Sequence, residues 1–140
     1  MGFTVKSTAI NGAVSPTSAA SAPAPVLPEW QWVGYLAMTR PLVGEYRAGL
    51  PMTVTVPVAG ATSFTLLPYS GATDPQLPRN GYTVIKTGAL PPGIVFNAAT
   101  GTFSGTRGAI STHEARYFTI RATNDAGSVE DVVRIDFLNI

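Results

Sequence analysis

Cysteine is absent from this chain, and histidine occurs only once. The lack of cysteine excludes disulfides, thiol nucleophiles, cysteine-type zinc sites and redox switching. The single histidine, His113, lies in the polar stretch GAISTHE, with no nucleophile-elbow pattern before it. A catalytic triad would have to use this residue, so the sequence indicates no catalytic set. We therefore predict that the protein is not an enzyme.

Charged side chains are also scarce. Asp, Glu, Lys and Arg make up 12% of the chain, the net charge is +1, and the nine cations are scattered without a basic block. Nucleic-acid binding by counterion release needs clustered cations, so we expect no nucleic-acid partner. The surface must instead be covered by small polar residues, which can be buried against another protein at little desolvation cost.

The acidic residues form no group suited to a metal or to sugar cleavage. A calcium ion takes roughly six to eight oxygen ligands, including several carboxylates. Asp125, Glu130 and Asp131 come closest to a cluster, but there is no D-x-D-x-D run, and Asp125 beside Asn124 fits a turn better. No pair of acids stands out for glycoside hydrolysis. We expect no metal and no cofactor.

Long hydrophobic runs are missing as well. No stretch approaches the ~20 apolar residues of a membrane span. The N-terminus lacks the apolar block and small-residue cleavage site of a secretory signal. We expect no membrane partner, and synthesis in a host cytoplasm without a signal peptide.

Residues 1–28 differ in composition from the rest of the chain, and we call them the arm. Residues 1–28 are rich in Ala, Ser, Thr and Pro, and their prolines are spaced too closely for a helix and too irregularly for a strand. This composition predicts an extended segment. Phe3, Val5 and Ile10 are large apolar side chains among small ones, and we predict that they anchor the arm on a partner.

Residues 29–140 consist of strand-like runs bounded by Gly and Pro, which is typical of an all-β sandwich. No helix of useful length is expected, because β-branched residues, Gly and Pro interrupt every window. We predict strands at residues 30–38, 52–58, 63–67 and 82–86, and a final hairpin of residues 116–123 and 129–138 around the turn NDAG. The hairpin should supply the centre of the core through Phe118, Ile120, Ala122, Val129, Val133, Ile135 and Phe137.

The first of these runs is aromatic. Trp30 and Trp32 share a face of the predicted strand, and Tyr35 follows. These three side chains are candidates for contact with a partner, and they are also candidates for a flat sugar-binding platform. The plainer alternative is that the two tryptophans belong to the core or clamp the junction between arm and sandwich.

Residues 90–106 read LPPGIVFNAATGTFSGT. This segment resembles the signature of the putative Ig domain family, cadherin-like sandwiches that carry a segment close to LPPGL-x5-TG-x2-SGT before a closing hairpin. Pro91 and Pro92 fix an extended backbone, Gly93 releases it, and Gly101 permits a tight turn between two short strands. The resemblance covers about residues 44–138 and implies an Ig-like or cadherin-like β-sandwich.

Two positions depart from the family pattern. Arg107 stands where a proline usually follows Gly-Thr, which predicts a different loop. The usual aromatic before the penultimate strand is shifted to Tyr117, behind Arg116, which predicts either altered packing or a tyrosine that faces solvent. Neither departure argues against the sandwich.

The resemblance carries no catalytic residues and implies a module of surface, adhesive, enzyme-appended or viral structural proteins. With the low charge and the arm, it leads us to predict a non-enzymatic virion protein, most concretely a bacteriophage capsid decoration or cement protein. Its partners would be the major capsid protein or other virion subunits, bound through the arm by a homo-oligomer or by many copies per particle. The alternatives are a phage tail or head-fibre component, and a carbohydrate-binding or adhesive surface module.

Overall fold

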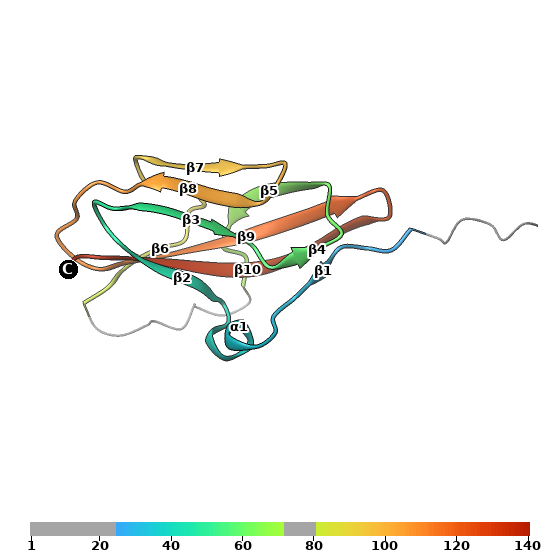
Figure 1. The fold of residues 1–140 in the computed structure, drawn as a ribbon, viewed down its shortest axis with the longest axis horizontal. Helices are drawn as coiled ribbons and strands as arrows, with labels where there is room; N and C mark the ends of the chain where they lie inside the picture. The colour runs from blue at the N-terminus through green and yellow to red at the C-terminus, as the bar shows by residue number, and fades with distance from the viewer. Residues whose placement is uncertain (1–24, 72–80) are drawn as a thin grey trace, which may run out of the picture.

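The computed structural model describes residues 25–71 and 81–140. Phe3, Val5 and Ile10, and all of the predicted arm except residues 25–28, lie outside the described residues. The described chain forms two β-sheets packed face to face, with one short helix beside them (Figure 1).

The larger sheet has the strand order β2 (Leu42–Arg47), β10 (Gly127–Leu138), β9 (Glu114–Asn124) and β5 (Ser63–Pro68), and β6 (Thr83–Ile85) also pairs with β9. The smaller sheet has the order β3 (Pro51–Thr55), β8 (Thr102–Thr106) and β7 (Ile94–Asn97). β1 (Glu29–Trp30) and β4 (Val58–Ala59) form a separate antiparallel pair. The predicted all-β sandwich is therefore confirmed.

The central hairpin of β9 and β10 supplies much of the core, as predicted. Its antiparallel register runs from the pair Gly127 and Asn124 to the pair Phe137 and Glu114. In the turn, the Asn124 side-chain Oδ1 accepts a hydrogen bond from the backbone N–H of Ala126 at 2.8 Å. All the predicted core residues of the hairpin are buried except Val129, which is half-buried and packs against the others.

Aromatic packing joins the two sheets. Phe103 of β8 is completely buried, and its ring centroid lies 4.8 Å from that of Phe96 and 5.3 Å from that of Phe118 on β9. Ile94 of β7 is buried as well. A single cluster of rings therefore connects β7, β8 and β9.

The glycines of the LPPG and SGT segments are required by close backbone contact between β7 and β8. Gly93 and Gly105 have φ angles of +88° and +125°, which side chains rarely tolerate. A Cβ on Gly93 would overlap the carbonyl oxygen of Thr106, and a Cβ on Gly105 would overlap that of Gly93. The backbone N–H of Thr106 donates to the Gly93 oxygen at 3.1 Å, so these strands meet through glycine.

The predicted strand over residues 30–38 is wrong. β1 ends at Trp30, the chain turns at Gly34 with φ 61°, and residues Tyr35–Thr39 form the helix α1. Leu36, Ala37 and Met38 are good helix formers, and no strand of the described chain pairs with this segment. α1 is only five residues long, so it agrees with the prediction that no helix of useful length forms within the described residues.

Smaller differences concern other strands. The predicted run of residues 52–58 is divided into β3 and β4, because Pro57 has no N–H for a β-ladder. Of the two outcomes predicted for Tyr117, the solvent-facing one is wrong. Its side chain is only 2% exposed and packs edge-on against Tyr69, with ring centroids 5.6 Å apart.

We expect Gly105→Ala to destabilise the fold by about 1–3 kcal/mol from the φ strain alone, with a further cost because the Gly93 carbonyl must move. Gly108→Ala is the control, since a Cβ there would meet nothing within 4 Å. Urea unfolding of both variants measures the difference. Equal midpoints for the two alanine variants would contradict the close-approach explanation.

Candidate functional site

Buried charged side chains are engaged with one another rather than with an open cleft. Glu114, at the start of β9, accepts hydrogen bonds from Arg116 Nε at 2.8 Å and from Arg107 Nη2 at 3.2 Å. Arg116 Nη1 also donates to the carbonyl oxygen of Ala89 at 2.7 Å. This network connects β9 to the segment after β8 and to the loop before β7.

The electrostatics of Glu114 do not suit a general acid. Burial alone would raise the pKa of this carboxyl group, but the hydrogen bonds and charges of Arg116 and Arg107 outweigh it and hold the pKa below its usual range. A carboxylate that two guanidinium groups keep ionised cannot donate a proton near neutral pH. Glu114 therefore acts as a structural anion, and Arg107, which departs from the family pattern, is one of its partners.

A second ionic pair lies on the outer side of the β9–β10 hairpin. Asp136 is completely buried and accepts two hydrogen bonds from Arg134, at 3.0 and 3.2 Å. Burial raises the pKa of the neighbouring Tyr117, while Arg134 acts in the opposite direction. Nearby, Ser70 donates its backbone N–H to Thr119 Oγ1 at 2.9 Å. Because these groups are buried within the fold, they stabilise it rather than face a substrate.

His113 contacts the end of the chain. Its Nδ1 accepts a hydrogen bond from the backbone N–H of Asn139 at 2.9 Å, and its ring lies beside Tyr82 with centroids 5.0 Å apart. Within residues 25–71 and 81–140, no three His, Asp or Glu side chains come together as metal ligands.

The two tryptophans fasten the segment before α1 to the sandwich. Trp30 and Trp32 stack on each other, with centroids 5.8 Å apart and planes at 6°, and both pack against the core. Trp32 Nε1 and Arg40 Nη2 both donate to Asp131 Oδ2 on β10, at 2.9 and 2.8 Å, and the Arg40 guanidinium lies 5.3 Å from the Trp32 ring centroid. The stack occupies a face of each ring, so the pair does not form an open aromatic platform.

This attachment positions an exposed apolar surface. Val33 precedes α1, and Tyr35 and Met38 lie on it. Their side chains are 64%, 76% and 84% exposed. α1 projects beside the start of β2 (Figure 1). Between α1 and β2 lies a hollow of about 200 Å³. We call these three side chains and the hollow the α1 surface. The hollow is lined by Tyr35, Leu36, Thr39, Leu42, Val43, Gly44 and Glu45.

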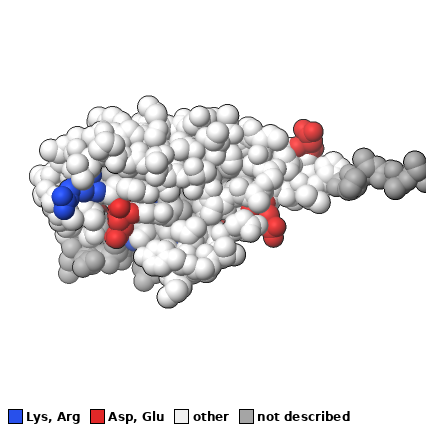
Figure 2. Space-filling view, in the orientation of Figure 1, with Lys and Arg blue, Asp and Glu red and all other residues white. Residues whose placement is uncertain are grey.

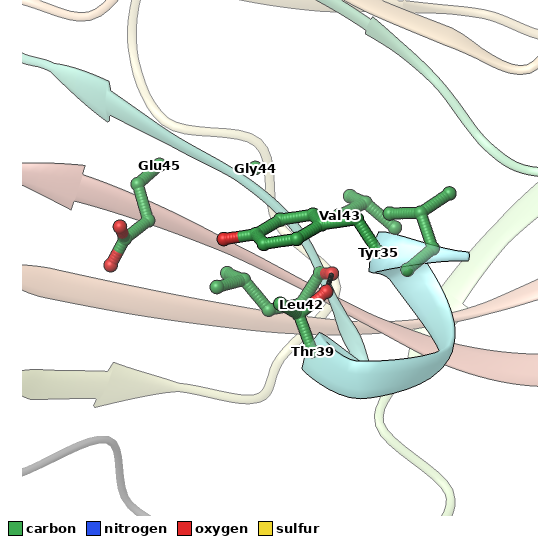
Figure 3. Close-up of a pocket in the computed structure, with 7 residues that line it drawn as sticks. Tyr35, Thr39, Leu42, Val43, Gly44 and Glu45 are labelled. Carbon is green, nitrogen blue, oxygen red and sulfur yellow. Dashed lines mark hydrogen bonds between the residues drawn. The ribbon is translucent and has the colours of Figure 1, made fainter. Parts of the chain in front are cut away.

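The α1 surface combines three exposed apolar side chains with an open hollow that both apolar and polar groups line. Figure 3 shows the Tyr35 ring extending from α1 along β2, with Leu42 and Thr39 beside it and Glu45 at the far end. Figure 2 shows few charged side chains on this face of the molecule. Such a surface is suited to contact with another protein rather than to chemistry on a small substrate.

The structure separates the residues that the sequence grouped together. Tyr35 lies on the α1 surface, whereas Trp30 and Trp32 are half-buried at its base, and Phe3, Val5 and Ile10 lie outside the described residues. Val33 and Met38 were missed, because residues 30–38 were assigned to a strand. The run of helix formers between Gly34 and Pro41 was the available signal.

The two packed sheets, with β2 parallel to β10 and a glycine-dependent contact between β7 and β8, define an Ig-like β-sandwich. The chain matches the Putative Ig domain family over residues 43–137, and it belongs to that family. The match agrees with the span of about 44–138 predicted from the sequence. Domains of this family are generally non-enzymatic, and membership indicates a surface, adhesive or structural module.

Two solved structures show a similarity at 17% sequence identity. One is described as a putative alpha-galactosidase from Bacteroides fragilis, with a TM-score of 0.45, covering 69% of this chain and 16% of that one. The other is the titin M3 domain, with a TM-score of 0.37, covering 69% of this chain and 88% of that one. The chain thus matches only a small part of the first protein.

No curated protein matches the sequence. In the part of the chain that the structure describes, no helix combines the length and apolarity needed to cross a bilayer.

We expect Glu114→Gln to lower the free energy of unfolding at pH 7 by about 3 kcal/mol, because it removes the charge that buried Arg116 and half-buried Arg107 share. Since the folded pKa of Glu114 lies below its unfolded value near 4.5, its contribution is complete above that value and is lost as pH falls through the folded pKa. The variant should therefore lose less stability than the natural chain on acidification.

The measurement is urea unfolding from pH 7 to pH 3. Glu130→Gln is the control. The side chains of Glu130 and its partner Arg121 are both exposed, so their ion pair should contribute at most about 1 kcal/mol. Parallel pH profiles for Glu114→Gln and the natural chain would contradict the assignment.

Proposed function

We propose that this chain is a non-enzymatic structural protein of a bacteriophage particle, and most concretely a capsid decoration protein. It binds the major capsid protein through its N-terminal arm together with the α1 surface. Many copies occupy the repeating sites of the shell, and the Ig-like sandwich is displayed on the outside.

The exposed apolar α1 surface carries this proposal. A patch around Val33, Tyr35 and Met38 is costly to leave in water and is stabilised when a protein partner covers it. The low charge of the chain favours a neutral protein partner over nucleic acid or an anionic membrane.

The position of the α1 surface next to the arm supports two-point attachment. The arm joins the sandwich at β1, and only residues 31–34 lie between β1 and α1. The bonds from Trp32 and Arg40 to Asp131 fix α1 against β10, so little conformational entropy is lost when this surface binds. An arm linked to a pre-formed surface binds more tightly than either contact alone, because the second contact is intramolecular.

The arm also distinguishes a virion subunit from an isolated adhesive module. A segment of small residues with a few large apolar ones, Phe3, Val5 and Ile10, is suited to burial against a neighbouring subunit. A sugar-binding module needs an open aromatic platform, and the stacked Trp30 and Trp32 do not offer one.

Deletion of residues 1–24 should abolish co-sedimentation with shells assembled from the major capsid protein of the same phage. The double variant Tyr35→Ser/Met38→Ser should weaken binding at least about tenfold, because two exposed anchors are lost. Val95→Ser is the matched control, since Val95 is 62% exposed on β7 of the other sheet.

All three proteins should retain the circular dichroism of a folded sandwich. A truncated protein that still coats the shells would overturn the proposal. Binding of the natural chain to polysaccharide instead of shells would favour the adhesive alternative.

A further inference from the structure

β2 is an open edge of the larger sheet. It pairs with β10 on one side, and no described strand pairs with its other side. At its start, Thr39 Oγ1 of α1 donates to the carbonyl oxygen of Leu42 at 3.0 Å, and the hollow of the α1 surface lies alongside. An open edge offers unpaired backbone groups to another strand, and natural proteins usually protect it.

Two opposite charges stand on this edge. Glu45 and Arg47 are exposed, lie two residues apart and therefore share a face of β2. Neither forms an ion pair within residues 25–71 and 81–140. Gly44 precedes Glu45, and Tyr46 lies between the two charged residues. Gly44 and Tyr46 share the other face of β2, since a Cβ on Gly44 would overlap the Tyr46 ring.

This arrangement is complementary to itself. In a continuous antiparallel sheet, residues opposite each other must share a face, so Glu45 can be opposite Glu45 or Arg47 of a second copy. Val43 lies where the register of β2 against β10 shifts, and it packs against the core. Pairing about Glu45 would bring like charges together, and pairing about Gly44 would leave both charges without a partner. Pairing about Tyr46 places Glu45 of each copy opposite Arg47 of the other, and the two-fold axis makes this contact twice.

We infer that the β2 edge is the dimer interface of this protein, and that two copies pair their β2 strands antiparallel about a two-fold axis at Tyr46. The larger sheets of the two copies then form one continuous sheet. The occupant of this edge is a second copy of the chain.

The inference goes beyond the proposed function, because it concerns contact between copies rather than contact with the shell. Val33 and Met38 are not needed for it. The arm is not needed either, so shell binding can fail while the dimer persists.

Charge reversal tests the inference on the full chain by sedimentation velocity over a concentration series. Glu45→Arg and Arg47→Glu should each weaken dimerisation at least about tenfold, because two attractive pairs become repulsive. The double variant Glu45→Arg/Arg47→Glu should restore the natural dimer, since both pairs are rebuilt with their ends exchanged. Asp125→Arg, on the exposed β9–β10 turn, changes the net charge as Glu45→Arg does and should have no effect.

All variants should keep the circular dichroism of the folded sandwich, because the changed side chains are exposed. A natural chain that stays monomeric up to millimolar concentration would overturn the inference. So would a dimer that ignores both single reversals, or one that the double variant does not restore.

Disulfide trapping tests the register directly, since the natural chain has no cysteine. Residues opposite each other in an antiparallel pair have Cα atoms about 4.5–5.5 Å apart, within the range of a disulfide. A mixture of Glu45→Cys and Arg47→Cys chains should form a covalent dimer on mild oxidation, and each variant alone should form much less. Equal cross-linking in all three samples would contradict the register about Tyr46.

Discussion

The packing of Phe103 between the two sheets is the contact on which the rest of the structure depends. Its ring is completely buried and touches Phe96 on one side and Phe118 of the central hairpin on the other. Without it, the sheet of β3, β8 and β7 would lose its main aromatic contact with β9. Burial of an aromatic side chain at such a position contributes several times the energy of a surface contact, and the glycines that bring β7 against β8 place this ring where it packs.

The part of the β9–β10 hairpin away from its turn is buried on both faces. One face forms the apolar core, and the other carries Tyr117, Thr119 and the pair of Arg134 with Asp136. Tyr69 and Ser70, which follow β5, cover part of this second face. The ionisable groups Arg134 and Asp136 on this second face bond to each other within the fold. Side chains available to a partner therefore lie on the exposed edges.

The α1 surface and the β2 edge adjoin each other, yet they offer different kinds of contact. The α1 surface offers apolar side chains without backbone pairing, which suits a pre-formed docking site. The β2 edge offers backbone hydrogen bonds and two charges, which suits pairing with a like strand. The segment with Trp32 and Arg40 holds α1 against β10 and so sets the distance between these two features. One face can therefore serve a subunit that touches both its own kind and another protein.

The amino-acid sequence by itself determined the all-β class, the extent of the family match, the central hairpin and its core residues, because alternation of apolar side chains and glycine-bearing turns act locally. It did not determine the course of residues 30–38, since stacking of Trp30 on Trp32 and the bonds to Asp131 depend on a strand about a hundred residues away. Val33 and Met38 were not foreseen as a surface because residues 30–38 were assigned to a strand, although the helix formers after Gly34 were a local signal. The burial of Tyr117 depends on its contact with Tyr69. The exposed edge of β2 results from the tertiary structure, because β10 is the single described strand that pairs with β2.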